Sequence, residues 1–142
     1  MESRIRIWSP FVIAYVGGIA TLYNEVEIGD YLGVYNPLFG YMNVEIYAGV
    51  LLGIVAALVS RTWRGALTFV LGLWAMGETA VILGILNGAD ATATSIMLVP
   101  LLVALVFGAL GIAAYAFVTA IAHILRGVFN RLAHANDPLT RG

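Results

Sequence analysis

Four runs of apolar residues dominate the sequence, and each is about long enough to cross a lipid bilayer. A transmembrane helix needs about 20 mostly apolar residues, because each helical residue advances about 1.5 Å through a hydrocarbon core about 30 Å thick. The runs cover residues 7–22, 44–60, 66–86 and 95–125. The sequence therefore predicts an all-α polytopic membrane protein, with four transmembrane helices in two hairpins.

The composition supports one membrane domain and no separate soluble domain. Of the 142 residues, 61% are hydrophobic and 11% charged, whereas soluble domains carry roughly 25% charged residues. We expect residues 1–142 to form a single four-helix domain, with an interfacial outer loop at 23–43 and a tail at 126–142. Arginines before the first run also fit a signal peptide, but we find no convincing cleavage site and interpret the run as a span. The fourth run exceeds the thickness of the hydrocarbon core, so it should tilt or protrude.

Charged residues alternate between the two sides of the predicted spans. The basic residues are all arginine and fall on one side, at Arg4, Arg6, Arg61, Arg64, Arg126, Arg131 and Arg141. The opposite side receives only acids, at Glu25, Glu27, Asp30, Glu45 and Asp90. Because arginines that flank spans are retained in the cytoplasm, this pattern predicts that both termini are cytoplasmic. A prokaryotic plasma membrane is the expected location.

Several chemistries are excluded by missing residue types. The chain has no cysteine and no lysine, so thiolate nucleophiles, iron–sulfur clusters and lysine Schiff bases are impossible within it. A net charge of −1 offers no basic face for nucleic acid. The outer acids lack the spacing of a calcium loop, and His123 is interpreted as an interfacial residue. No catalytic motif is present, so we expect no enzyme activity, no cofactor and no metal site.

Small residues recur at helical spacing within the spans, where they allow helix backbones to approach each other in lipid. The predicted packing positions are Gly49, Gly53, Ala57, Gly77, Gly84 and Gly108. Packing within the chain is the first interpretation. The alternative is that one stripe, most plausibly 49–57, faces a second copy of the chain.

A single acid interrupts the third span, in the stretch GLWAMGETAVILG. Glu78 lies about 18 Å into its helix, slightly beyond the bilayer midplane, where charged residues are disfavoured and usually face the bundle interior or a wet cavity. Hydroxyl groups within reach from inward helix faces define a candidate intramembrane polar site of Glu78, Tyr15, Tyr47, Thr79 and Tyr115. The alternatives are a neutral acid with a hydrogen-bond partner, a proton or cation site, and a contact to a partner's polar group.

Three short motifs carry a family resemblance over roughly the first three spans. They are Trp8-Ser9-Pro10-Phe11, then Asn43 and Gly49 within MNVEIYAGVLLGIVAAL, and Gly72-Leu73-Trp74. The chain thereby resembles the SPW-repeat small membrane proteins, although Gly77-Glu78-Thr79 stands where a second Ser-Pro-aromatic motif would be expected. The resemblance implies a compact four-span fold and no assigned activity.

Two classes of function fit these features. The first, which we favour, is a small non-catalytic integral membrane protein, a structural or accessory subunit that assembles with itself or with a larger membrane complex. The second is a small oligomeric transporter or channel in which Glu78 carries a proton or cation between the two halves. The expected partners are the lipid bilayer and other membrane subunits, including further copies of the chain.

Overall fold

The structure, a computed structural model, describes residues 2–38, 40, 42–88 and 92–135, and this part of the chain is helical without strands. The helices are α1 (Glu2–Tyr23), α2 (Glu25–Leu32), α3 (Met42–Ser60), α4 (Arg64–Leu86) and α5 (Ala93–Ala135). Four of them, α1, α3, α4 and α5, are long and apolar enough to cross a membrane. The prediction of an all-α protein with four spans is therefore confirmed.

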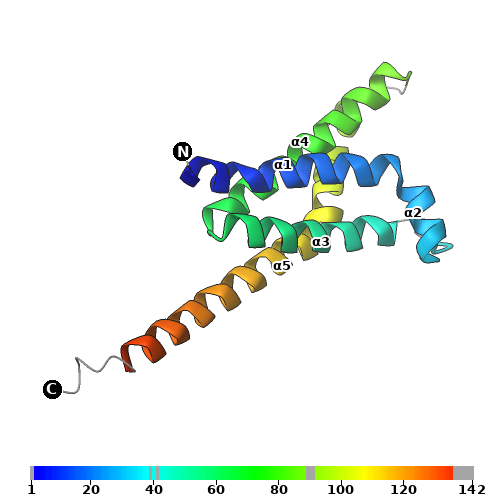
Figure 1. Cartoon of the computed structure of the whole chain (residues 1–142). Coiled ribbons are helices and arrows are strands. Elements are labelled where there is room, and N and C mark those ends of the chain that lie inside the picture. Colours follow the sequence, from blue (N-terminus) through cyan, green and yellow to red (C-terminus); the bar gives the residue numbers. More distant parts are fainter. Residues whose placement is uncertain (1, 39, 41, 89–91, 136–142) are drawn as a thin grey trace.

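The helices extend beyond the apolar runs from which they were predicted. α1 begins at Glu2 and so includes the arginines before the first run, and α5 continues past residue 125 to Ala135. Backbone hydrogen bonding can continue into polar sequence, because the length of a helix does not depend on hydropathy alone. At about 1.5 Å per residue α5 is about 65 Å long. Its C-terminal half projects beyond the other helices (Figure 1).

The spans form two hairpins that pack on one another. α1 and α3 lie side by side and are connected through α2, while α4 and α5 form the second pair (Figure 1). The most extensive contacts join the hairpins, α3 to α5 and α1 to α4. α3 and α4 are consecutive but touch little, so the order around the bundle is α1, α3, α5, α4.

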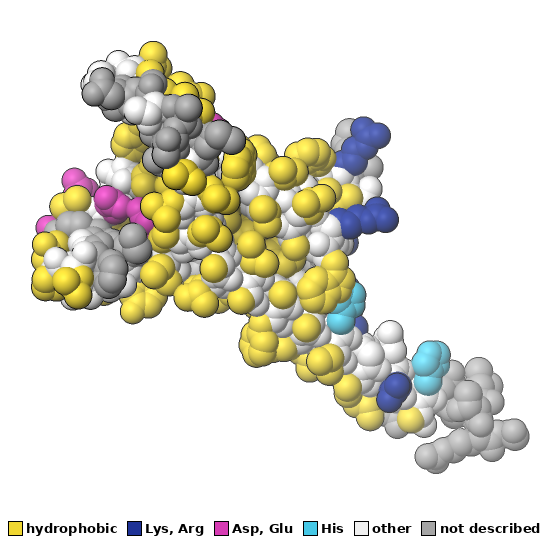
Figure 2. All heavy atoms as spheres, turned by 180° about the vertical axis from the view of Figure 1, so that it is seen from behind, with side chains coloured by type: hydrophobic (Ala, Val, Ile, Leu, Met, Phe, Trp, Pro, Cys, Tyr) yellow, Lys and Arg dark blue, Asp and Glu magenta, His cyan; other side chains and the backbone are white. Residues whose placement is uncertain are grey.

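A narrow core fills the centre of the bundle. Its fully or almost fully buried members are Ala14, Ala56, Ala57, Phe69, Leu73, Met76, Phe107 and Tyr115. Alanine on α1 and α3 faces larger side chains on α4 and α5, which lets the backbones approach closely. Much of the outer surface is apolar (Figure 2), as expected for helices that face lipid.

The connection between α1 and α3 contains the short helix α2. This helix ends at Gly33, whose φ of 66° lies in the left-handed region that glycine adopts without strain. The backbones of Asn36 and Gly40 then form two hydrogen bonds with each other. Asn36-Pro37 thus follows the end of the helix, and the interfacial position of the connection stays a prediction. Phe39 and Tyr41 lie outside the described residues.

Candidate functional site

The two ends of the bundle carry opposite charges. Figure 2 shows arginine side chains gathered at one end and most acidic side chains at the other. At the acidic end the carboxyl groups of Glu25 and Glu45, from α2 and α3, lie close to each other. Asp90 and Arg141 lie outside the described residues. Which end faces the cytoplasm stays a prediction.

Glu78 lies on the outer face of α4. The buried face of this helix includes Phe69, Leu73 and Met76. At about 100° per residue, Glu78 is rotated by about 200° from Met76 and so points away from the core. Its side chain is partly exposed, and it shares its face with the exposed side chains of Leu71 and Trp74. The expectation that this acid faces the bundle interior was wrong, because the α4 residues that meet α1 and α5 occupy the opposite side of the helix.

The hydroxyl groups proposed around Glu78 are only partly brought together. Tyr15 and Thr79 do meet, with 2.9 Å between their hydroxyl oxygens, and they join α1 to α4. Tyr47 points outward from α3 with 59% of its surface exposed. Tyr115 of α5 lies near the N-terminus of α4, far from Glu78. Its hydroxyl donates a hydrogen bond to the backbone carbonyl of Thr62 at 2.6 Å. A site that unites these side chains with Glu78 is therefore not present in the single chain.

Glycines of α3 lie directly against the backbone of α5. A Cβ atom at Gly49 would meet the carbonyl oxygen of Phe107, and one at Gly53 would meet that of Gly111. Ala57 is also buried, so the face 49–57 is covered within the chain and is not open to a second copy.

The other predicted packing positions lie on α4 and α5. A Cβ atom at Gly77 would lie 2.8 Å from Cα of Pro100, so α4 and α5 also approach closely there. A Cβ atom at Gly108 would lie 3.1 Å from a methyl group of Leu73. Gly84 is only partly buried. Among these predicted packing positions, close helix approach thus occurs where α5 meets α3 and α4.

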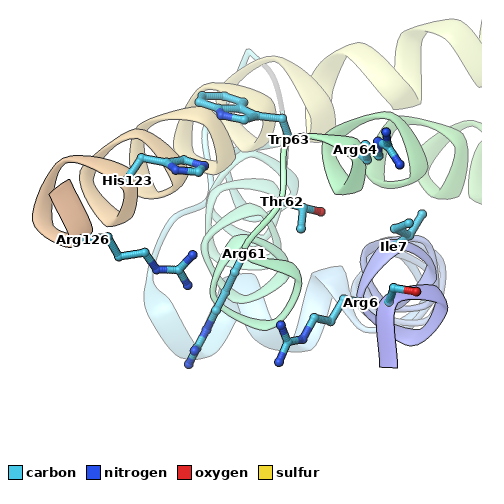
Figure 3. A pocket seen from close by; sticks show the side chains of 9 residues that line it. Arg6, Ile7, Arg61, Thr62, Trp63, Arg64, His123 and Arg126 are labelled. Carbon is cyan, nitrogen blue, oxygen red and sulfur yellow. The ribbon is translucent and has the colours of Figure 1, made fainter. Parts of the chain in front are cut away.

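An arginine-lined cleft of about 890 Å³ lies at the basic end of the bundle. α1, the 61–63 connection, α4 and α5 all contribute to its lining, which consists of Ser3, Arg6, Ile7, Arg61, Thr62, Trp63, Arg64, His123 and Arg126. In Figure 3 the side chains of Arg6, Arg61 and Arg126 extend toward the same region from different parts of the chain. No acidic side chain is among these lining residues. The cleft is therefore a concentration of positive charge.

Hydrogen bonds hold the connection that forms one wall of this cleft. Ser60 is fully buried and its hydroxyl lies 3.0 Å from that of Thr62. The carbonyl of Thr62 accepts the hydrogen bond from Tyr115, which anchors the connection to α5. Arg61 has a φ of 55°, an uncommon conformation for a residue with a side chain. The side chain of Arg61 therefore leaves from a connection that α5 holds in place.

The face of α5 that meets this connection continues into the cleft. Thr119, one turn after Tyr115, is 1% exposed, and its hydroxyl has no hydrogen-bond partner among the described residues. His123 follows after another turn, and its ring lies parallel to that of Trp63 with 6.2 Å between ring centroids. Arg126 lies on the same face of the helix. We call this row of residues the α5 stripe: Tyr115, Thr119, His123 and Arg126. Tryptophan favours the headgroup level of membranes, which agrees with a cleft at the boundary of the bilayer.

The cleft was not identified from the sequence. Its arginines lie at residues 6, 61, 64 and 126. The sequence analysis inferred only that these arginines lie on the same side of the predicted spans. The common side was the available signal, because residues at one end of a small bundle are close in space. The sequence did not show which of the arginines converge.

Comparisons with protein-family models, curated proteins and solved structures found no match. The resemblance to the SPW-repeat proteins stays a prediction. Among the described residues no cluster of histidine and acidic side chains could hold a metal ion.

Proposed function

We propose that this chain is a small non-catalytic subunit of a prokaryotic plasma membrane, and that it assembles with a second copy of itself through the outer face of α4. In this proposal both termini and the arginine-lined cleft are on the cytoplasmic side. The observation that carries the proposal is the outward position of Glu78 within a membrane-spanning helix.

The outer face of α4 has the spacing of a helix-pairing surface. Apolar residues and Glu78 recur at alternating steps of three and four, as in the core positions of a coiled coil. We call these residues the α4 stripe: Leu67, Leu71, Trp74, Glu78, Val81 and Ile85. Most are exposed and none is buried in the single chain. A second helix with the same repeat could interlock with this stripe along most of the span.

The cost of exposing Glu78 to lipid favours a covered stripe. A charged residue at the centre of a spanning helix is disfavoured by roughly 2.5–3.5 kcal/mol on insertion scales. Glu78 lies about 21 Å along α4 from Arg64, well inside the span. Contact with a polar group of another subunit would reduce this cost.

A second copy is the occupant that fits this acid best. Copies with the same orientation in the membrane can form a two-fold interface, in which a residue near the axis meets its own counterpart. A protonated carboxyl group is both a donor and an acceptor, so two glutamic acids can hydrogen-bond to each other. A single polar residue in such a repeat also determines the register of the pair.

The transporter interpretation receives less support. It requires Glu78 between the two hairpins, whereas this residue lies on the outer face of α4. Self-association explains the outward acid without a pathway through the chain.

Cysteine cross-linking tests the proposed interface. The chain has no native cysteine, so each engineered thiol reports on one position. Leu71→Cys, on the stripe, should form disulfide-linked dimers in membranes under mild oxidation, because a disulfide requires Cα atoms within about 7 Å. The matched control Val70→Cys is one residue away but off the stripe, and it should remain monomeric. Equal cross-linking at both positions, or none at any stripe position, would refute the interface.

Substitution of Glu78 tests the role of the acid. Glu78→Leu should weaken dimerisation about 3- to 20-fold in a resonance-energy-transfer titration, because interhelical hydrogen bonds in membranes contribute about 0.6–1.7 kcal/mol. Glu78→Gln retains a donor and an acceptor and should stay near wild type. Purification of wild type as a monomer bound to a different membrane protein would replace the second copy by that partner.

A further inference from the structure

We propose that the arginine-lined cleft binds a phosphate-bearing anion, and that the natural source of this anion is the headgroup of an acidic phospholipid. The site lies at the basic end of the bundle and does not depend on self-association through the α4 stripe. It rests on the cleft itself, the rigid connection that forms its wall and the apolar surface beside it.

The side chains that line the cleft suit phosphate. Arginine presents a planar fork of N–H donors that matches two phosphate oxygens at once, and it stays charged at all physiological pH values. Four arginines line the cleft, and none of the other lining residues is acidic. A group with more than one phosphate would contact several of these guanidinium groups. Ser3 and Thr62 place further hydroxyl groups in the lining.

The dimensions of the cleft suit a headgroup better than a single inorganic ion. A volume of about 890 Å³ is near the upper end of the range of about 300–1,000 Å³ that is typical of small-molecule sites. Arg6 from α1, Arg126 from α5 and Arg61 from the 61–63 connection extend toward the same region (Figure 3). A ligand there would therefore contact α1, the 61–63 connection and α5 together.

The cleft wall is preorganised for a ligand. The Tyr115–Thr62 hydrogen bond and the buried Ser60 hold the connection that carries Arg61. Because this backbone is already fixed, less conformational entropy is lost when the arginine binds. The unpartnered, buried hydroxyl of Thr119 lies on the α5 stripe that leads to His123 and Arg126. This hydroxyl is one polar group on the stripe that no described residue satisfies.

Apolar surface beside the arginines favours a lipid as the source. Ile7 and Trp63 belong to the lining, and Trp63 is exposed. On α5, Ile124 and Leu125 are exposed next to His123 and Arg126. A headgroup in the cleft would thus leave acyl chains against apolar side chains. Basic pockets between helices at the cytoplasmic side of membranes are suited to anionic headgroups of this kind.

The experiment measures lipid binding to the full chain in detergent by native mass spectrometry. The probes are tetraoleoyl cardiolipin, which carries two phosphates, dioleoylphosphatidylcholine as the zwitterionic lipid, and inorganic pyrophosphate as the soluble phosphate. The cleft variants are Arg61→Gln and Arg126→Gln. The control variants Arg4→Gln and Arg131→Gln remove the same charge from residues that do not line the cleft.

Wild type should bind cardiolipin in preference to phosphatidylcholine. Each cleft variant should lose about tenfold or more in cardiolipin affinity, because it loses the charge-assisted hydrogen bonds from a guanidinium group to phosphate. The control variants should change the cardiolipin affinity less than about threefold. Far-UV circular dichroism of each variant verifies that it is folded. Arg126→Lys keeps the positive charge but loses the planar set of guanidinium N–H donors. An intermediate cardiolipin affinity in this variant therefore supports recognition of phosphate by the geometry of the guanidinium group.

The pyrophosphate measurements separate the two sources of the anion. Failure of millimolar pyrophosphate to bind or to displace cardiolipin supports a lipid headgroup. Tight pyrophosphate binding that the same cleft variants abolish supports the phosphate site and assigns it to a soluble ligand. Equal losses in the cleft and control variants, or no cardiolipin preference in wild type, would overturn the proposal.

Discussion

Gly53→Ala is the sharpest test of the packing between α3 and α5. The added methyl group would meet the carbonyl oxygen of Gly111, and the nearest atoms are all backbone, so no side chain can rotate away. The two helices must therefore separate locally. Overpacking of this kind costs about 1–3 kcal/mol, and replacing a helical glycine by alanine returns about 0.5–1 kcal/mol. We expect a net destabilisation of up to about 2.5 kcal/mol.

Gly127→Ala is the matched control for this substitution. Gly127 also lies in a helix, α5, but a Cβ atom there would have nothing within 4 Å. Only the gain in helix propensity remains, so this variant should be stabilised by about 0.5–1 kcal/mol. Reversible unfolding by sodium dodecyl sulfate in bicelles, followed by tryptophan fluorescence, measures both. If Gly53→Ala is as stable as Gly127→Ala, the close approach of α3 and α5 is refuted.

Two further substitutions can be measured by the same unfolding assay. Tyr115→Phe removes the hydrogen bond to Thr62 and should lower stability by about 0.5–1.5 kcal/mol, whereas Tyr47→Phe, at an exposed side chain, should leave it unchanged; equal effects would contradict the anchoring role of Tyr115. Arg61→Gly relieves the left-handed conformation and should keep stability at the wild-type value or raise it by up to about 1 kcal/mol. A clear loss of stability in Arg61→Gly would show that the side chain has a larger structural role than the backbone geometry indicates.

The number of spans could be predicted because it depends on local properties of the chain. Each apolar run contains enough hydrophobic residues to favour the bilayer by itself, whichever helix it later contacts. The same holds for the separation of charges, because residues that flank successive spans alternate between the two ends. The ends of α1 and α5 were less predictable, since a helix can continue into polar sequence without a change in backbone hydrogen bonding.

The faces of the helices could not be predicted in the same way. In a soluble protein, polar residues mark the outer face of a helix, but in lipid both faces are apolar and the usual periodicity is weak. Glu78 was therefore placed inward by the general rule for buried charges, while the structure turns it outward. For the same reason the partner of Gly49 and Gly53 could not be identified, although their small size marked them as contact residues.

For this protein, then, the amino-acid sequence alone specifies an all-helical chain with four apolar spans, because hydrophobic length and the placement of arginines act locally. The packing of the hairpins determines which surfaces meet: α5 covers the glycines of α3, α4 presents Glu78 outward, and arginines from three separate parts of the chain line one cleft. These outcomes depend on the rotation of each helix about its axis. That rotation is set by side chains that meet between helices far apart in the sequence. It therefore cannot be inferred from the residues of one helix alone.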